Sequence, residues 1–303
     1  MANPILTSLT TYTDELSFDF IQECIFGGET VKHCTFVEGN GLTYKLPYID
    51  HTLVLEANTC DITSGQSQST YAQASMTLCD LVVQKDECLK DLFAYFTNVY
   101  QPKARREAKQ DIPTAYAEYY YATYMKNLEY AIDYAIWNGN GDCLKGLWYD
   151  ITNTYQSSMV VVTGSTLTTS NILAEVNEMV AGVTCFGKPM TLFMSPSNYT
   201  LYKQALVAAN YVNYALPAQN GGEEGIQVPG FEWIKAVPAN LGTNDKLLLI
   251  AEDNLFIGTS AEEELTKITG EYINYNNRFR TSAEFNLGVA IAFPSQAIYW
   301  YKV

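Results

Sequence analysis

Basic residues are scarce in this chain of 303 residues, which has four arginines in all and 18 basic against 33 acidic side chains, a formal charge of −15. Proteins dedicated to binding nucleic acid present a basic surface, so the composition argues against that class. No apolar run approaches the ~18 residues of a membrane-spanning helix, and residues 1–16 lack the basic start of a signal peptide. With 48% apolar residues, we expect a folded protein made in a cytoplasm, with no membrane part.

Residues that commonly build catalytic and metal sites are also few. The two histidines, His33 and His51, lie in an extended N-terminal region, and the chain has no Gly-x-Ser-x-Gly motif. Cys24, His33 and Cys34 have a spacing that matches no known metal-binding pattern. We therefore predict no catalytic, cofactor-binding or metal-binding residue, no cofactor and no enzymatic activity.

Cysteine usage indicates the redox compartment. The chain has seven cysteines, an odd number, and no pair has the Cys-x-x-Cys spacing. We therefore expect reduced, partly buried thiols, as in proteins of the cytoplasm. The glycosylation motif Asn198-Tyr-Thr200 is interpreted as a chance match, because the start of the chain shows no secretion signal.

Three further patterns fail as functional motifs. Residues 141–146 have the two-glycine spacing of a phosphate loop, but Leu147 and Trp148 follow where that loop needs Lys and Ser or Thr. The acidic run 262–264 is typical of a solvated face. A basic cluster is offset by acidic neighbours, so we interpret it as a solvated bend or a subunit contact. That cluster consists of Lys103, Arg105, Arg106 and Lys109.

Residues 30–79 predict extended structure. A turn signal at 38–41 precedes an alternating run at 42–46, Pro47 places its strand at an edge, and residues 61–70 are almost entirely polar. This pattern predicts a long β-hairpin with little core of its own. Because a two-stranded hairpin is marginal in water, we expect it to lie on another surface.

Helices are predicted next. Apolar residues recur at helical spacing from about Asp86 to Tyr100, and Pro102 is expected to end that helix. A second pattern over 114–138 predicts a helix of roughly 35–40 Å, ended by the Asn-Gly-Asn-Gly sequence at 138–141.

The rest of the chain alternates strands and helices. We expect Ser170 to cap a helix over 172–180 and Ser195-Pro196 to begin another. Strands are predicted at 159–162, 190–194, 231–237, 247–251, 255–257, 285–293 and 298–301. The fold class is therefore α+β, without internal repeats or a clear linker.

The order of these parts resembles the major capsid proteins of tailed bacteriophages, which have the Hong Kong 97-type fold. The long helix ends in Leu-Glu-Tyr-Ala-Ile-Asp-Tyr-Ala-Ile-Trp-Asn-Gly-Asn-Gly (128–141) and is followed by Leu-Lys-Gly-Leu-Trp (144–148). The resemblance continues through five other segments, at 77–85, 188–197, 228–238, 250–256 and 285–294, and includes the terminal strand.

The resemblance implies an N-terminal arm (1–34), an extended β-hairpin loop (35–75), a peripheral domain with a spine helix (76–150 and 259–303) and an axial domain (151–258). It implies a structural subunit that assembles with itself, as pentamers and hexamers, into an icosahedral virion shell around double-stranded DNA. It also implies a portal and decoration proteins as partners, with assembly in the host cytoplasm. Because this chain starts at Met1 with a short arm, we expect a separate scaffolding protein.

Lys45 is the one lysine between His33 and Cys79, so the cross-link made by some family members is not expected. Two alternatives stay open. One is an encapsulin-like protein compartment, which would enclose protein instead of DNA. The other is an α+β enzyme or sugar-binding module, suggested by the 23 tyrosines.

Overall fold

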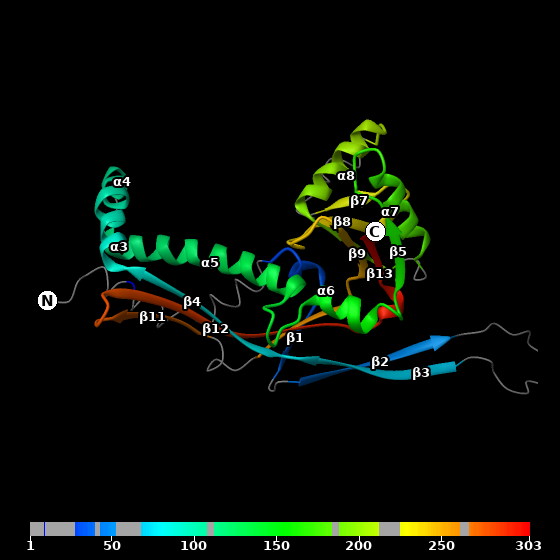
Figure 1. The fold of residues 1–303 in the computed structure, drawn as a ribbon, viewed down its shortest axis with the longest axis horizontal. Helices are drawn as coiled ribbons and strands as arrows, with labels where there is room; N and C mark the ends of the chain where they lie inside the picture. Colours follow the sequence, from blue (N-terminus) through cyan, green and yellow to red (C-terminus); the bar gives the residue numbers. More distant parts are fainter. Residues whose placement is uncertain are drawn as a thin grey trace, which may run out of the picture.

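The computed structural model describes residue 9 and residues 28–39, 43–52, 68–107, 112–183, 188–211, 225–260 and 267–303. These residues form an elongated α+β molecule (Figure 1), which confirms the predicted fold class. One half is a sheet with a long helix along it, the other half is a second sheet with two helices, and a separate hairpin projects below them.

The first sheet has the strand order β1 (Thr35–Gly39), β10 (Leu255–Ser260), β12 (Arg278–Ile291) and β11 (Lys267–Ile273), and β4 (Cys79–Cys88) also pairs with β12. The sequence pattern missed β11 and the first seven residues of β12. Their side chains are mixed rather than alternating, and both strands are held by pairing: β12 is antiparallel to β11 and, over ten residues, to β4. Pairing of this kind is invisible to a local hydrophobic pattern.

The second sheet has six strands, in the order β5 (Val160–Gly164), β13 (Ile298–Lys302), β9 (Lys246–Ala251), β6 (Met190–Met194), β8 (Phe231–Pro238) and β7 (Ile226–Val228). Alternate residues of its central strands face opposite sides. Leu192 packs toward α7 (Ile172–Ala181) and α8 (Pro196–Ala208), whereas Phe193 belongs to the core around the long helix. The central strands therefore separate two hydrophobic cores.

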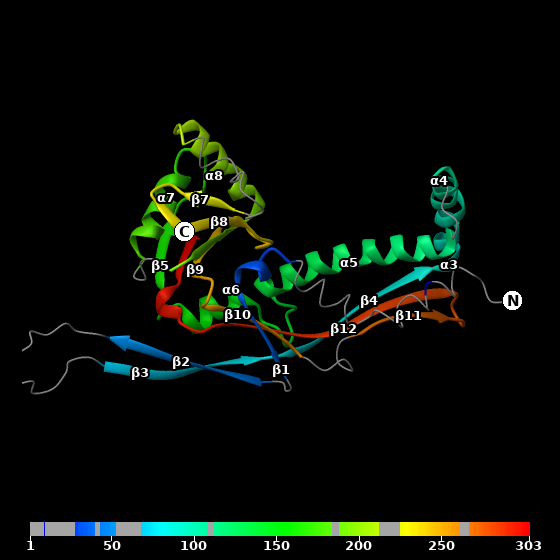
Figure 2. The same ribbon diagram turned by 180° about the vertical axis from the view of Figure 1, so that it is seen from behind.

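The predicted long helix is confirmed as α5 (Ile112–Asn138). Its 27 residues span about 40 Å at 1.5 Å per residue. The helix runs along β4 and β12 (Figures 1 and 2). Its end reaches the second sheet, where Trp137 is fully buried and packs against Trp148 and Phe193 with ring centroids 4.9 and 5.2 Å away. Thus α5 joins the two halves.

The preceding helical segment differs from the prediction in two ways. It begins at Leu89, because residues 79–88 form β4, and it continues past Pro102: α3 (Leu89–Tyr95) leads through the π-helical turn η2 (Phe96–Tyr100) into α4 (Gln101–Arg106). Pro102 lies in the first turn of α4, where the hydrogen-bond pattern changes from π to α. A missing backbone N–H and a fixed φ are tolerated at such a position.

A hairpin is present: β2 (Thr43–Thr52) and β3 (Gln68–Thr77) pair antiparallel over ten residues. Residues 35–39, which the predicted loop included, instead form β1 and pair with β10 in the first sheet. Both views show the hairpin projecting from the body of the molecule (Figures 1 and 2). It is attached at its base, where a small cluster contains Met76, Leu78 and Ala290 with Tyr44 and Leu46 packed against it. Its distal strands pair only with each other in the described part of the chain.

Short elements complete the fold: η1 (Val31–His33), α6 (Leu147–Asp150), the π-helical η3 (Ile151–Tyr155) and η5 (Pro294–Gln296). The family resemblance assigned the terminal strand to the peripheral domain. In the structure, β13 pairs with β5 and β9 in the six-stranded sheet. Ser170 is not the cap of α7: the N-cap is Asn171, whose side chain makes no cap bond and instead accepts from the Thr168 backbone N–H at 2.7 Å. Ser195 does cap α8, accepting from Asn198 N at 3.2 Å.

The expectation that every cysteine is a reduced thiol is wrong for one pair. Cys79 and Cys143 form a disulfide with a Cα–Cα distance of 5.6 Å, within the usual range for such a bond. The bond joins the start of β4 to the turn after α5. The two residues are 64 positions apart, so no local spacing could have revealed the pair. Cys34 and Cys88 are free, and the other three cysteines lie outside the described residues.

We expect tryptic peptides containing Cys79 and Cys143 to run as one linked species without reductant and to separate after reduction, because the fold holds the two residues at bonding distance. Mass spectrometry of protein denatured in a thiol-blocking reagent checks this. Cys88→Ser is the matched control and should leave the linked peptide in place. Separate, alkylated Cys79 and Cys143 peptides from air-exposed protein would contradict the pairing.

Candidate functional site

The two histidines lie in different elements. His33 Nδ1 lies 3.4 Å from Glu252 Oε1, and Nε2 is buried with no hydrogen-bond partner in the described residues. His51 lies in β2 of the hairpin. No group of three or more metal-ligating side chains occurs in the part of the chain that the structure describes, and Cys24 of the rejected Cys24–His33–Cys34 pattern lies outside it.

Cys34 has the environment of an inert thiol. Its Sγ donates to the carbonyl oxygens of Thr30 and Val31 at 2.9 and 3.2 Å. Burial, together with the carboxylates of Asp133 and Glu252, raises the pKa of Cys34 far above its ordinary value. A thiol that stays protonated is a poor nucleophile and metal ligand.

The other motifs also have structural roles. In the glycine-containing turn 138–146, Asn140 Oδ1 accepts from the backbone N–H groups of Asp142 and Leu144 at 3.1 and 3.0 Å, so these groups are already bonded. The basic cluster lies largely in α4, where Lys103 is 4.0 Å from Glu107. Lys109 and the acidic run 262–264 lie outside the described residues. No described helix is long and apolar enough to cross a membrane.

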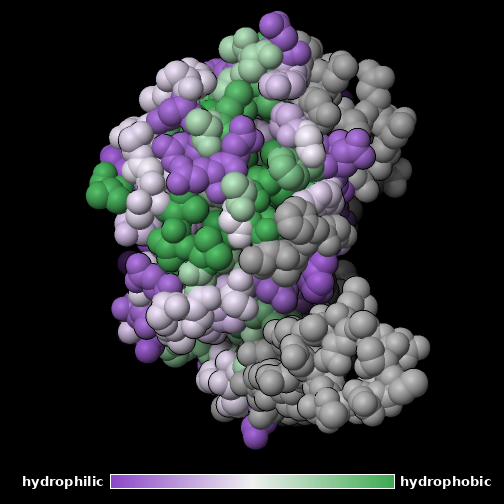
Figure 3. All heavy atoms as spheres, turned by 90° about the vertical axis from the view of Figure 1, so that its right-hand side faces the viewer, coloured by the Kyte–Doolittle hydropathy of each residue, from purple (hydrophilic) through white to green (hydrophobic). Residues whose placement is uncertain are grey.

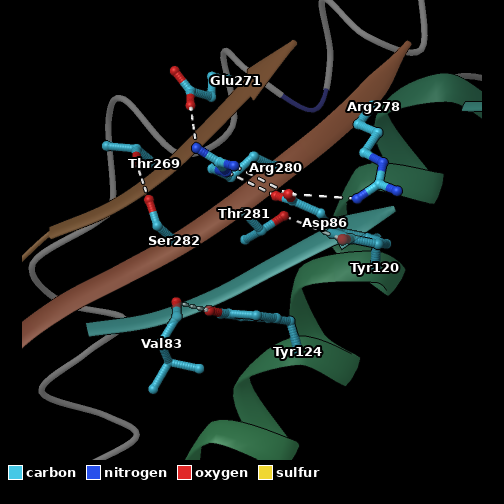
Figure 4. Close-up of polar contacts among 10 residues, drawn as sticks. All are labelled: Val83, Asp86, Tyr120, Tyr124, Thr269, Glu271, Arg278, Arg280, Thr281 and Ser282. Atoms are coloured by element: carbon cyan, nitrogen blue, oxygen red, sulfur yellow. Dashed lines mark hydrogen bonds and ion pairs between the residues drawn. The ribbon is translucent and has the colours of Figure 1, made fainter. Parts of the chain in front are cut away.

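A network of paired charges covers the sheet formed by β4, β12 and β11 (Figure 4). Asp86 and Arg280 are direct neighbours across β4 and β12. Arg280 donates to both Asp86 oxygens, from Nε at 2.7 Å and from Nη2 at 3.0 Å. Arg278 Nη1 is 3.9 Å from the same carboxylate, and Glu271 is 3.8 Å from Arg280 Nη1. Four charges thus tie three strands together.

Tyrosines fasten α5 to the same sheet (Figure 4). Tyr124 donates to the carbonyl of Val83 at 3.1 Å, and the Tyr120 hydroxyl lies 3.1 Å from Thr281 Oγ1. Burial raises the pKa of Tyr116 and of Tyr120, so both hydroxyls stay protonated at any ordinary pH. They line a groove of 690 Å³ between α5, α3 and β4. Tyrosine rings and hydroxyl groups line the groove, and such a lining is typical of a contact surface.

The Asp86–Arg280 pair predicts a pH effect. The hydrogen bond from Arg280 lowers the pKa of Asp86 in the folded state, below the ~3.9 of an unfolded aspartate. The stabilisation is therefore fully present above about pH 4 and disappears as the pH falls through the lowered, folded pKa. NMR titration should give Asp86 a midpoint below 3.9, and Arg280→Gln should raise it. An unchanged midpoint in that variant would show that the bond is absent in solution.

Large side chains are exposed at several places outside these contacts. Tyr130 on α5 is 66% exposed and Tyr275, in the turn between β11 and β12, is 87% exposed. On the half with the six-stranded sheet, Val207 and Tyr211 are about half exposed. The end view of that half shows hydrophobic side chains gathered in the middle of the face (Figure 3). Exposed aromatic and apolar residues of this kind are typical of protein–protein contacts.

Comparisons with known proteins identify the fold. No family model and no curated protein matches the chain. Solved structures do match over nearly the whole length. A chain of the satellite phage P4 procapsid is 10% identical, with a TM-score of 0.56, over 93% of this chain and 89% of the other.

Two further structures give the same picture. The capsid of an empty GTA particle is 8% identical, with a TM-score of 0.55, over 91% of this chain and 90% of the other. A virus-like particle from Pyrococcus furiosus is 11% identical, with a TM-score of 0.53, over 95% of this chain and 99% of the other. The chain therefore has the fold of tailed-phage capsid proteins, the Hong Kong 97-type fold that its sequence resembles.

Proposed function

We propose that this chain is a structural shell subunit, which assembles as pentamers and hexamers into an icosahedral capsid around double-stranded phage DNA. The observation that carries the proposal is the similarity to chains of assembled particles, which spans about nine tenths of both chains. The projecting hairpin supports it, because its strands pair with nothing else in the described residues and need a second surface. In this proposal, catalysis has no part.

The charge of the chain supports enclosure of DNA without tight binding. A net charge of −15 repels phosphate at low salt, and several described basic side chains are already paired with carboxylates. The further proposals follow the resemblance: a separate scaffolding protein, a portal and decoration proteins as partners, assembly in the host cytoplasm, and a final place in the virion. The division into arm, hairpin loop, peripheral domain and axial domain also stays a proposal.

A second candidate is a protein compartment built on the same fold. The similarity to the virus-like particle from Pyrococcus furiosus, which covers nearly all of both chains, favours this alternative. The two candidates share the shell and differ in its contents. A compartment would enclose protein, whereas a capsid would enclose DNA.

Electron microscopy and sedimentation velocity of the purified protein, alone and with co-expressed neighbouring genes, test the proposal. We expect closed particles of megadalton size. Nuclease-resistant DNA inside particles from infected or induced cells would support the capsid, and protein cargo without DNA would favour the compartment. A monomer under all of these conditions would overturn both.

A further inference from the structure

A hollow of 570 Å³ lies where the turn after α5 meets the loop between β8 and β9. Two lysines reach it from parts of the chain about a hundred residues apart: Lys145 from the turn and Lys246 from the start of β9. Asp142 is the one carboxylate among its described lining residues, so the charges in the lining sum to about +1. In a chain of net charge −15, a concave positive site is uncommon.

Both lysines rest on aromatic rings instead of carboxylates. Lys145 Nζ lies 4.8 Å from the centre of the Tyr149 ring, and Lys246 Nζ lies 5.1 Å from the centre of the Trp148 ring. Neither forms an ion pair with any residue that the structure describes, whereas nearby Lys302 lies 3.8 Å from Asp245. Partial burial lowers the pKa of Lys246, and the charge of Asp245 acts in the opposite direction. Burial raises the pKa of Asp150, and the charge of Lys145 opposes that rise, so each lysine has a carboxylate nearby but no described carboxylate within ion-pair distance. An anion entering the hollow would meet two cations that have no carboxylate within ion-pair distance among the described residues.

Hydrogen bonds join the two segments that form the walls of the hollow. Asn138 Nδ2 and Trp148 Nε1 both donate to the carbonyl of Leu241, at 3.3 and 3.0 Å, which holds the turn and the loop together. Gly242 has φ +69°, and a Cβ there would lie 2.6 Å from Asn138 Nδ2, so a larger residue would force the two segments apart. A preformed site loses little entropy on binding.

We propose that this hollow receives an acidic side chain from a second copy of the chain. The inference rests on the proposed shell function. Identical copies of charge −15 repel one another, and close packing needs local contacts of opposite sign. Lys145 and Lys246 supply such a contact, because they share one concave site and form no close ion pair with a described residue of their own chain. The abundant anions in an assembly of this protein are the 33 acidic side chains of each copy.

Cross-linking of mixed isotopes tests the contact directly. Particles assembled from equal amounts of ¹⁴N and ¹⁵N subunits are treated with a water-soluble carbodiimide, which activates a carboxylate so that a lysine amine attacks it. The amide forms, and the activated oxygen leaves as part of a urea. We expect mixed ¹⁴N–¹⁵N peptides at Lys145 or Lys246, identified by mass spectrometry. The proposal would be overturned if every link at these lysines joined two peptides of the same isotope, as a link within one subunit does. It would also be overturned if no link formed at either lysine.

Two double variants that remove the same charge test how much the contact at Lys145 and Lys246 contributes to assembly. Lys145→Gln/Lys246→Gln should raise the subunit concentration needed for assembly at least tenfold while leaving the melting temperature within a few degrees. Lys90→Gln/Lys126→Gln removes the same charge from exposed helix positions outside the hollow and should have a much smaller effect. Equal effects of the two pairs would overturn the inference.

The same material separates failure of the inference from failure of the proposed function. Acetylation of the two lysines by an N-hydroxysuccinimide ester should be slower in empty particles than in free subunits. Protection that appears only in DNA-filled particles would assign the hollow to phosphate and overturn the second-copy proposal alone. Absence of any particles would overturn the shell function, and this inference with it.

Discussion

Replacing residues 47–73 with a four-residue Gly-Ser linker should leave a folded subunit that no longer forms particles. The cut falls just beyond the Leu46–Ala74 pair, so Met76, Leu78 and Ala290 at the hairpin base stay in place. Among the described residues, the two large cores are formed by side chains outside the replaced segment, and shortening a loop changes its closure entropy only slightly. A neighbouring copy, however, would lose the surface on which the hairpin is expected to lie.

Circular dichroism measures folding of this variant, and sedimentation velocity measures assembly. Met76→Ala is the opposing control: Met76 is 1% exposed, and its truncation should cost about 2–4 kcal/mol of subunit stability with the hairpin kept. If the shortened chain melts as early as Met76→Ala, the hairpin belongs to the subunit core. If it still forms particles of normal size, the hairpin is not an assembly element.

Trp137→Ala should lower the free energy of unfolding by about 4 kcal/mol, the usual cost of truncating a fully buried tryptophan. The indole packs against Trp148 and Phe193, and its Nε1 donates to Thr30 Oγ1 at 2.8 Å. Truncation leaves a cavity where α5 meets the six-stranded sheet and removes the partner of the Thr30 hydroxyl. Most of the loss should therefore appear in a single cooperative transition.

Chemical denaturation followed by tryptophan fluorescence and circular dichroism measures this loss. Tyr130→Ala, on the same helix but 66% exposed, is the matched control and should change stability by no more than about 0.5 kcal/mol. Equal losses in the two variants would mean that the end of α5 is not packed as described. Separate transitions for the two halves would mean that Trp137 does not couple them.

Local patterns predicted the elements that bury their own side chains. Strand β6 was predicted with the bounds that the structure has, because four of its five residues are apolar, and all five are buried. Helix α5 was predicted because its apolar positions recur over seven turns. By contrast, β11 and the start of β12 are held by neighbouring strands, and the helix through Pro102 is held by a change from π to α bonding. These elements depend on contacts or backbone geometry that a short stretch of sequence does not show.

The candidate surfaces were predictable only in part. The hairpin and its need for a partner surface followed from its alternating strands and polar tip. The Asp86–Arg280 pair and the hollow at Lys145 and Lys246 did not follow from the sequence. Each consists of residues about a hundred or more positions apart, which only the fold brings together. The Cys79–Cys143 bond was missed because its two residues are 64 positions apart and meet only in the fold. One signal was available: Lys145 and Trp148 occur in the short segment after the long helix that carried the family resemblance.

Strand β12 also has a mechanical consequence. It is one unbroken strand of 14 residues, and it pairs with β4 and β11 in its first part and with β10 near its end. A pull along the long axis of the molecule would slide β12 past β4, so that their ten paired residues would share the force and separate together instead of one by one. Strands loaded lengthwise in this way resist tension far better than strands peeled from an end. The subunit should therefore resist tension best along its own long axis.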